Sequence, residues 1–187
     1  MLQITIPSGE IFDESTNTFI QVKEQTLTLE HSLVSLYKWE SKWHKPFLEA
    51  QKRGDLKQEK SQEEILDYIK CMTLTQNVDP NVYLGLTNAN IQAINEYIED
   101  PMTATTFSDE KKKGGKQRIV TAELIYYWMI ALQIPIKCEK WHLNKLLTLI
   151  RVCNIENTPP EKKSMADIRK TNRELNMARR KRLNSKG

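Results

Sequence analysis

The chain of 187 residues is long enough to bury a core, and 39% hydrophobic with 28% charged residues is ordinary for a soluble globular protein. No stretch reaches the roughly 18 uninterrupted apolar residues of a membrane span, and the first ten residues do not resemble a secretory signal. The three cysteines, Cys71, Cys138 and Cys153, are odd in number and widely spaced. This pattern argues against a disulfide framework and favours reduced thiols in a cytoplasm.

The charge is spread unevenly along the chain. Residues 161–187 contain ten Lys/Arg and three Asp/Glu, a net charge of +7, whereas the whole chain carries +4. The rest therefore sums to −3. A mildly acidic body with a basic end predicts that this end contacts something acidic, or stays solvated and keeps the protein soluble.

Residues 1–29 are predicted to form a small antiparallel β-ribbon. Ile4 and Ile6 alternate with polar neighbours, and Leu27 and Leu29 alternate with Thr26 and Thr28, which is the period of a half-buried strand. The turn-forming segments PSGE and DESTN interrupt the pattern, so a hairpin and a three-stranded ribbon both fit. So few strands are marginal alone, and we expect the ribbon to pack on the helices that follow.

Residues 30–157 are predicted to form a helical core domain, with a solvated linker at 49–60 and a mobile loop at 109–118. Hydrophobic residues recur at steps of three and four, Ser and Thr precede these runs as caps, and prolines follow them. The predicted helices begin near Leu33, Ser61, Thr87, Thr121 and Glu139 and end near Pro46, Thr73, Pro101, Pro135 and Asn154. Residues 158–187 are predicted to be a basic helical tail. The predicted fold class is therefore mainly α.

Large apolar side chains at helical spacing are predicted to be mostly core. These side chains are Trp39, Trp43, Trp128, Trp141, Leu143, Leu147 and Ile150.

Cys138 and His142 lie four residues apart, a spacing that can place two metal ligands on one helix face. A zinc site needs two further ligands, and neither remaining cysteine has a paired partner nearby. His142 with Asn144 resembles the pair of metal-dependent nucleases, but the ββα frame of those sites is missing. Ordinary helix positions explain all three residues better, and we predict no metal site.

The remaining chemical patterns are also incomplete. The histidines His31, His44 and His142 have no turn-embedded nucleophile or glycine-flanked oxyanion loop beside them. The glycines within Lys112–Lys116 lack the spacing and the preceding strand of a phosphate-binding loop. The sequence therefore predicts no catalytic residues and no cofactor, and favours a binding protein over an enzyme.

Two groups of residues are candidates for contacts with a partner. Tyr126, Tyr127 and Trp128 cannot all face the core, because neighbours on a helix point about 100° apart. Basic residues concentrate in the tail, where an acidic protein is favoured as partner over nucleic acid because no aromatic residues are interleaved with the charges. The predicted partner-binding residues are Tyr127, Trp128, Arg179, Arg180, Lys181 and Arg182.

Four segments carry a resemblance to a protein family. They are LTLEHSLVSLYKWESKWHKPFL, DYIKCMTLTQNVDP, YIEDPMTATTFSD and IYYWMIALQIPIKCEKWHLNKLLTLIRVCNIEN. These segments resemble the tail assembly chaperones of long-tailed, siphovirus-like bacteriophages. The resemblance covers most of Leu27–Asn157 and contains no catalytic motif; the lysine-rich loop Lys111–Arg118 is the point of departure from it.

The resemblance implies a small, largely helical protein of the host cell cytoplasm that is absent from the mature virion. Such chaperones bind the tape measure protein and help recruit tail tube subunits during tail morphogenesis. Many have a second, frameshifted longer form, and self-association is left open. The alternatives are a structural virion component, such as a connector or tail-completion protein, and, less favoured, a nucleic-acid-binding regulator.

Overall fold

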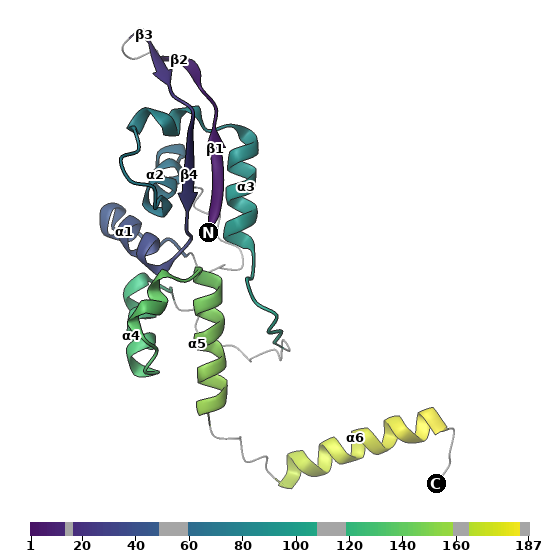
Figure 1. Ribbon diagram of the computed structural model, residues 1–187. Coiled ribbons are helices and arrows are strands. Elements are labelled where there is room, and N and C mark those ends of the chain that lie inside the picture. Colours follow the sequence, from purple (N-terminus) through teal and green to yellow (C-terminus); the bar gives the residue numbers. More distant parts are fainter. Residues whose placement is uncertain (14–16, 49–59, 108–118, 159–164, 184–187) are drawn as a thin grey trace. The chain divides into compact units, whose positions relative to one another are not determined.

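The computed structural model describes residues 1–13, 17–48, 60–107, 119–158 and 165–183. The chain is mainly α-helical with a small antiparallel β-structure at its N-terminus, as predicted (Figure 1). Two compact units are distinguished, Met1–Asn154 and Ile155–Gly187. The predicted division of the chain into segments 1–29, 30–157 and 158–187 stays a prediction. Within the described ranges, no helix has the length and apolar character needed to cross a bilayer.

The N-terminal ribbon is two nested antiparallel strand pairs. Strand β1 (Leu2–Ile6) pairs with β4 (Gln25–Leu29), and β2 (Gly9–Asp13) pairs with β3 (Thr18–Val22). The register places the isoleucine of β1 at position 4 opposite the leucine of β4 at position 27. The antiparallel hairpin is therefore confirmed, and the three-stranded alternative is wrong for the strands described here. One face of β1 and β4 is buried, which the alternation predicted.

Serine and threonine caps begin the first helices at the predicted positions. Helix α1 (Leu33–Trp43) follows Ser32, α2 (Gln62–Met72) follows Ser61, and α3 (Asn88–Glu99) follows Thr87. In each case the side chain of the cap residue accepts a hydrogen bond from the backbone N–H three residues later in the chain. The side chain of that later residue accepts one from the backbone N–H of the cap residue. The 3₁₀ helix η1 (Pro80–Gly85) lies between α2 and α3.

In the second half of the domain, one predicted helix start differs from the structure. Helix α4 (Ala122–Ala131) is capped by Thr121 as predicted. The predicted helix start at Glu139 is wrong, because that residue belongs to the 3₁₀ helix η2 (Ile136–Lys140) and α5 (Leu143–Asn157) begins four residues later. Helix α6 (Met165–Leu183) follows in the second unit. The predicted linker 49–60, except its last residue, and the predicted loop 109–118 lie outside the described residues.

Helix α1 joins two hydrophobic clusters. Trp39 is 1% exposed and belongs to the first cluster, whose other buried residues come from the strands, α2, η1 and α3. Leu33 and Leu36 belong to the second cluster, which α4 and α5 complete. In Figure 1 α1 accordingly lies between α2 and α4. The two faces of one short helix therefore position both halves of the domain.

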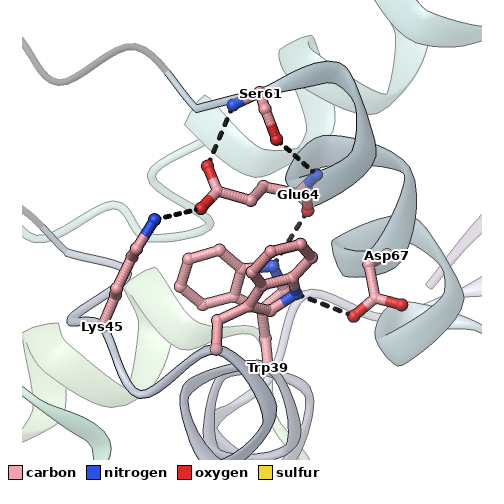
Figure 2. A network of polar contacts seen from close by, with 6 residues as sticks. Trp39, Lys45, Ser61, Glu64 and Asp67 are labelled. Atoms are coloured by element: carbon pink, nitrogen blue, oxygen red, sulfur yellow. Dashed lines mark hydrogen bonds and ion pairs between the residues drawn. The ribbon is translucent and has the colours of Figure 1, made fainter.

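A polar network fastens α1 to the first turns of α2 (Figure 2). The indole Nε1 of Trp39 donates to the Glu64 carbonyl at 2.9 Å, and that of Trp43 donates to Asp67 at 3.0 Å. The Glu64 carboxylate accepts from the Lys45 ammonium at 2.6 Å and from the Ser61 N–H at 2.9 Å. The Lys45 contact, followed by the Ser61 contact, lowers the pKa of Glu64. Glu64 thus caps its own helix and binds the chain that follows α1.

Glu40 connects α1 to α4 through two backbone donors. Its buried carboxylate accepts from the Ala122 N–H at 2.7 Å and from the Phe47 N–H at 2.8 Å. Ala122 is the first residue of α4, so the charge also lies where the helix dipole favours an anion. Burial raises the pKa of Glu40, and the two backbone hydrogen bonds act against that rise.

Glu40→Ala is expected to lower the free energy of unfolding by about 2–4 kcal/mol, because two backbone donors lose their acceptor. Glu40→Gln should cost less, since its single carbonyl oxygen still serves one of the two donors. Urea denaturation of both variants measures this, with Glu99→Ala as an exposed control at the end of α3. Equal stability of Glu40→Ala and the wild type would contradict the role assigned to this carboxylate.

Candidate functional site

Two of the residues considered for metal binding, His142 and Asn144, form hydrogen bonds with backbone groups. The Asn144 N–H donates to Nδ1 of His142 at 3.3 Å. The ring proton therefore lies on Nε2, which donates to the Tyr97 backbone carbonyl at 2.9 Å. Both ring nitrogens are therefore occupied. Cys138 is buried in the second cluster. In the described ranges, no three His, Cys, Asp or Glu residues are placed to hold one ion.

Asn144 explains the His-Asn spacing seen in the sequence. Its side-chain amide donates to the carbonyls of Ile98 and Asp100, at 2.9 and 2.7 Å. Together with the His142 contact to Tyr97, this ties the start of α5 to the last turn of α3. The pair binds protein backbone, which is a structural role.

The fold brings together two histidines that are far apart in the sequence. The rings of His31 and His142 lie 5.2 Å apart edge to face, and His31 Nδ1 pairs with the Tyr68 hydroxyl at 2.6 Å. Burial, and then repulsion from His142, lower the pKa of His31 from 6.5 to about 3. Burial also raises the pKa of the tyrosine hydroxyl. Near neutral pH these shifts keep His31 neutral and Tyr68 protonated, and their hydrogen bond joins the segment between β4 and α1 to α2.

One predicted contact residue, Tyr127, lies on an exposed apolar side of α4. Tyr127 is 64% exposed and Ile130, three residues on, is 74% exposed. The buried face of α4 consists of Ala122, Ile125 and Met129. We call Tyr127 and Ile130 the α4 face. A helix that is apolar all round is normally covered all round, so this face is a candidate contact surface.

The aromatic residues near the α4 face divide between core and surface. Trp128 is partly buried against the second cluster, so its ring contributes more to packing than to the outer face. Trp141 is 37% exposed with the Lys145 ammonium 4.6 Å from its ring centroid. The prediction that Trp141 is core was therefore wrong. It precedes α5, so the helical spacing that placed it beside the buried Leu143 does not apply.

The other predicted core residues are mostly buried. Trp39, Leu143 and Ile150 are in the core, while Trp43 and Leu147 pack against it and remain partly exposed. The three thiols are free, with Cys138 buried and the other two partly exposed.

The predicted contact residues of the tail all belong to α6. The side chains of Arg179, Arg180 and Arg182 are exposed. Lys181 also belongs to α6, but its side chain is not among those that the structure describes. The α4 face and these arginines belong to different units. That Tyr127 and the arginines contact a partner stays a prediction. The sequence did not single out Ile130, because its exposure depends on how α4 packs.

Comparison of the chain with protein families, with curated proteins and with solved structures gave no match.

Proposed function

We propose that this chain is a non-enzymatic tail assembly chaperone of a long-tailed bacteriophage. It binds the tape measure protein and helps recruit tail tube subunits, acts in the host cell cytoplasm and leaves before the virion is complete. The four sequence segments that resemble this family support the proposal. The single structural observation that carries it is the exposed α4 face.

The α4 face suits a helical partner with an apolar stripe. Tyr127 offers a large amphipathic ring, a side chain that is enriched where binding energy concentrates, and Ile130 extends the apolar surface by about one turn. A tape measure protein is long and helical, and apolar stripes on it aggregate until the tube encloses them. Laying such a stripe against an exposed helix face is a recurring mode of peptide recognition.

The size of the α4 face implies weak individual contacts. Complete burial of one large apolar side chain contributes about 1.5–3 kcal/mol, so two contribute about 3–6 kcal/mol. Association itself costs about 4–15 kcal/mol in lost freedom of motion. One copy bound through this face alone would dissociate readily. Many copies along one tape measure chain would supply avidity, and tube subunits could still displace them one at a time.

The α4 face is tested by Tyr127→Ser/Ile130→Ser in co-expression with the tape measure protein of the same genome. We expect the double variant to leave the tape measure protein as insoluble as it is without the chaperone. Ile65→Ser/Leu74→Ser removes two exposed apolar side chains elsewhere and is expected to solubilise the tape measure protein like the wild type. The measurement is the soluble fraction of the tape measure protein and its co-purification.

Unchanged solubility with and without the wild-type chain would overturn the proposed function. Equal effects of the two double variants would overturn the role of the α4 face only. The main rival, a structural virion component, is distinguished by mass spectrometry of purified particles, because it would remain in them.

A further inference from the structure

One side of α6 carries a regular stripe of arginine and asparagine. Its members are Arg169, Asn172, Arg173, Asn176 and Arg180, which line one hollow along the helix surface with Met177 at its margin. The steps of three, four and seven residues place them on one face, and Arg173 and Arg180 are only about 20° apart around the helix axis. All five side chains are exposed. We call these five residues the α6 stripe.

The surrounding sequence makes this helix strongly cationic. Helix α6 contains seven Lys/Arg and two acids, Asp167 and Glu174, so its net charge is +5. Glu174 is exposed and follows Arg173 by one residue, which turns it about 100° away from the stripe. The α6 stripe therefore presents positive charge and amide groups with no carboxylate among them.

The residue types of the stripe match the edges of base pairs. Arginine donates two hydrogen bonds to guanine O6 and N7, and asparagine pairs in the same two-point way with adenine N6 and N7. The major groove of B-form DNA admits an α-helix. From Arg169 to Arg180 the helix rises about 16 Å, which corresponds to about five base pairs at 3.4 Å each.

An acidic protein is a poorer fit to the same stripe. Protein interfaces concentrate their energy in buried aromatic and apolar anchors surrounded by polar groups. The α6 stripe has only Met177 at its margin, and Leu175 lies on another side of the helix. The sequence disfavoured nucleic acid because no aromatic residues are interleaved with the charges. Aromatic residues matter for stacking on single strands, and recognition of a duplex does not require them.

We propose that α6 binds double-stranded DNA, with the α6 stripe in the major groove. Arg179 lies about 20° around the helix from Asn172, at the edge of the stripe, where it contacts a flanking phosphate, whereas Arg182 lies about 180° from Arg173 and faces away from the groove. This activity is additional to the proposed chaperone function and uses a different surface. Duplex RNA is excluded as the ligand because its deep, narrow major groove does not admit side chains.

The test measures fluorescence anisotropy of a labelled 20-base-pair DNA duplex of mixed sequence with the full-length protein, in 50 to 200 mM NaCl. The stripe variant Arg173→Gln is compared with Arg182→Gln, which removes the same charge from the opposite side of α6. Glutamine retains helix propensity, and both side chains are exposed. We expect binding that weakens steeply with salt, and an affinity at least tenfold lower for the stripe variant than for its matched control.

Each contrary outcome overturns the proposal. Absence of wild-type binding in 50 mM NaCl would remove DNA as the ligand. Equal weakening by the two variants, or equal affinity for duplex RNA of the same sequence, would reduce α6 to a general polycation. Equally tight binding of polyglutamate would assign the helix to an acidic protein surface. None of these results would bear on the α4 face, so the two proposals fail separately.

Discussion

Trp39→Ala is expected to lower the free energy of unfolding by about 3–5 kcal/mol, the largest effect of any single substitution considered. The indole is almost completely buried where α1 meets α2 and the ribbon. It stacks with Trp43 at a centroid distance of 6.1 Å and meets Phe47 edge to face at 5.1 Å. Alanine leaves a cavity that these neighbours can fill only by moving, and the indole hydrogen bond is lost with the ring.

Denaturation by urea measures this effect, and two further variants separate its causes. Trp39→Phe keeps most of the packing and removes the hydrogen bond to the Glu64 carbonyl, so it should cost about 1–2 kcal/mol. Trp141→Ala is the matched control, since its partly exposed ring should cost about 1 kcal/mol or less. Similar losses from the alanine variants at positions 39 and 141 would contradict the assignment of Trp39 to the core.

Acidification is expected to destabilise the domain through His31. The pKa of this side chain is 6.5 when exposed and about 3 in the folded state. Between these values the unfolded chain binds a proton that the folded chain does not. Stability is therefore fully present above about pH 6.5 and falls as the pH decreases, by at most about 1.4 kcal/mol per pH unit. From pH 6.5 to pH 5 the expected loss from His31 is about 2 kcal/mol.

The measurement is the slope of unfolding free energy against pH, from urea denaturation between pH 7.5 and 5. His31→Gln should show a slope that is almost unchanged near pH 7.5 and smaller by about one proton near pH 5, whatever its absolute stability. His44→Gln is the matched control for the loss of a histidine, because the His44 side chain is exposed at the end of α1 and lies outside the buried junction. An unchanged slope in the His31 variant would mean that His31 is not held neutral by its surroundings.

The physical origin of this pH dependence lies in the junction around His31. The ring is enclosed by Tyr68 of α2 and by His142, which precedes α5. His142 in turn packs against Tyr97 of α3, whose hydroxyl donates to the buried Glu30. Also at the junction, the Leu143 N–H donates to the His31 carbonyl at 2.7 Å. A proton on the His31 ring has no carboxylate beside it among these contacts, so charging it would loosen the point where the two hydrophobic clusters meet.

Local rules determined much of the fold from sequence. The cap at Ser61 and its return bond from Glu64 involve residues three apart, so they depend on no distant contact. The alternation of Ile4 and Ile6 likewise placed the buried face of the ribbon. The boundary before α5 failed because Cys138–Trp141 fits a helical pattern equally well, and only the surrounding packing selected a 3₁₀ turn and an exposed indole there.

The sequence by itself determined the helical class, most helix starts and the concentration of positive charge near the end of the chain. Only the tertiary structure decided which polar groups meet. Glu40 reaches the N–H of Ala122, 82 residues away, and His31 lies against His142 although nothing in their local sequences connects them. Short-range hydrogen bonds and residue periodicity are written into neighbouring positions, whereas contacts across a domain depend on how whole faces pack. The same reason left Ile130 unrecognised until the packing of α4 showed which of its sides remains uncovered.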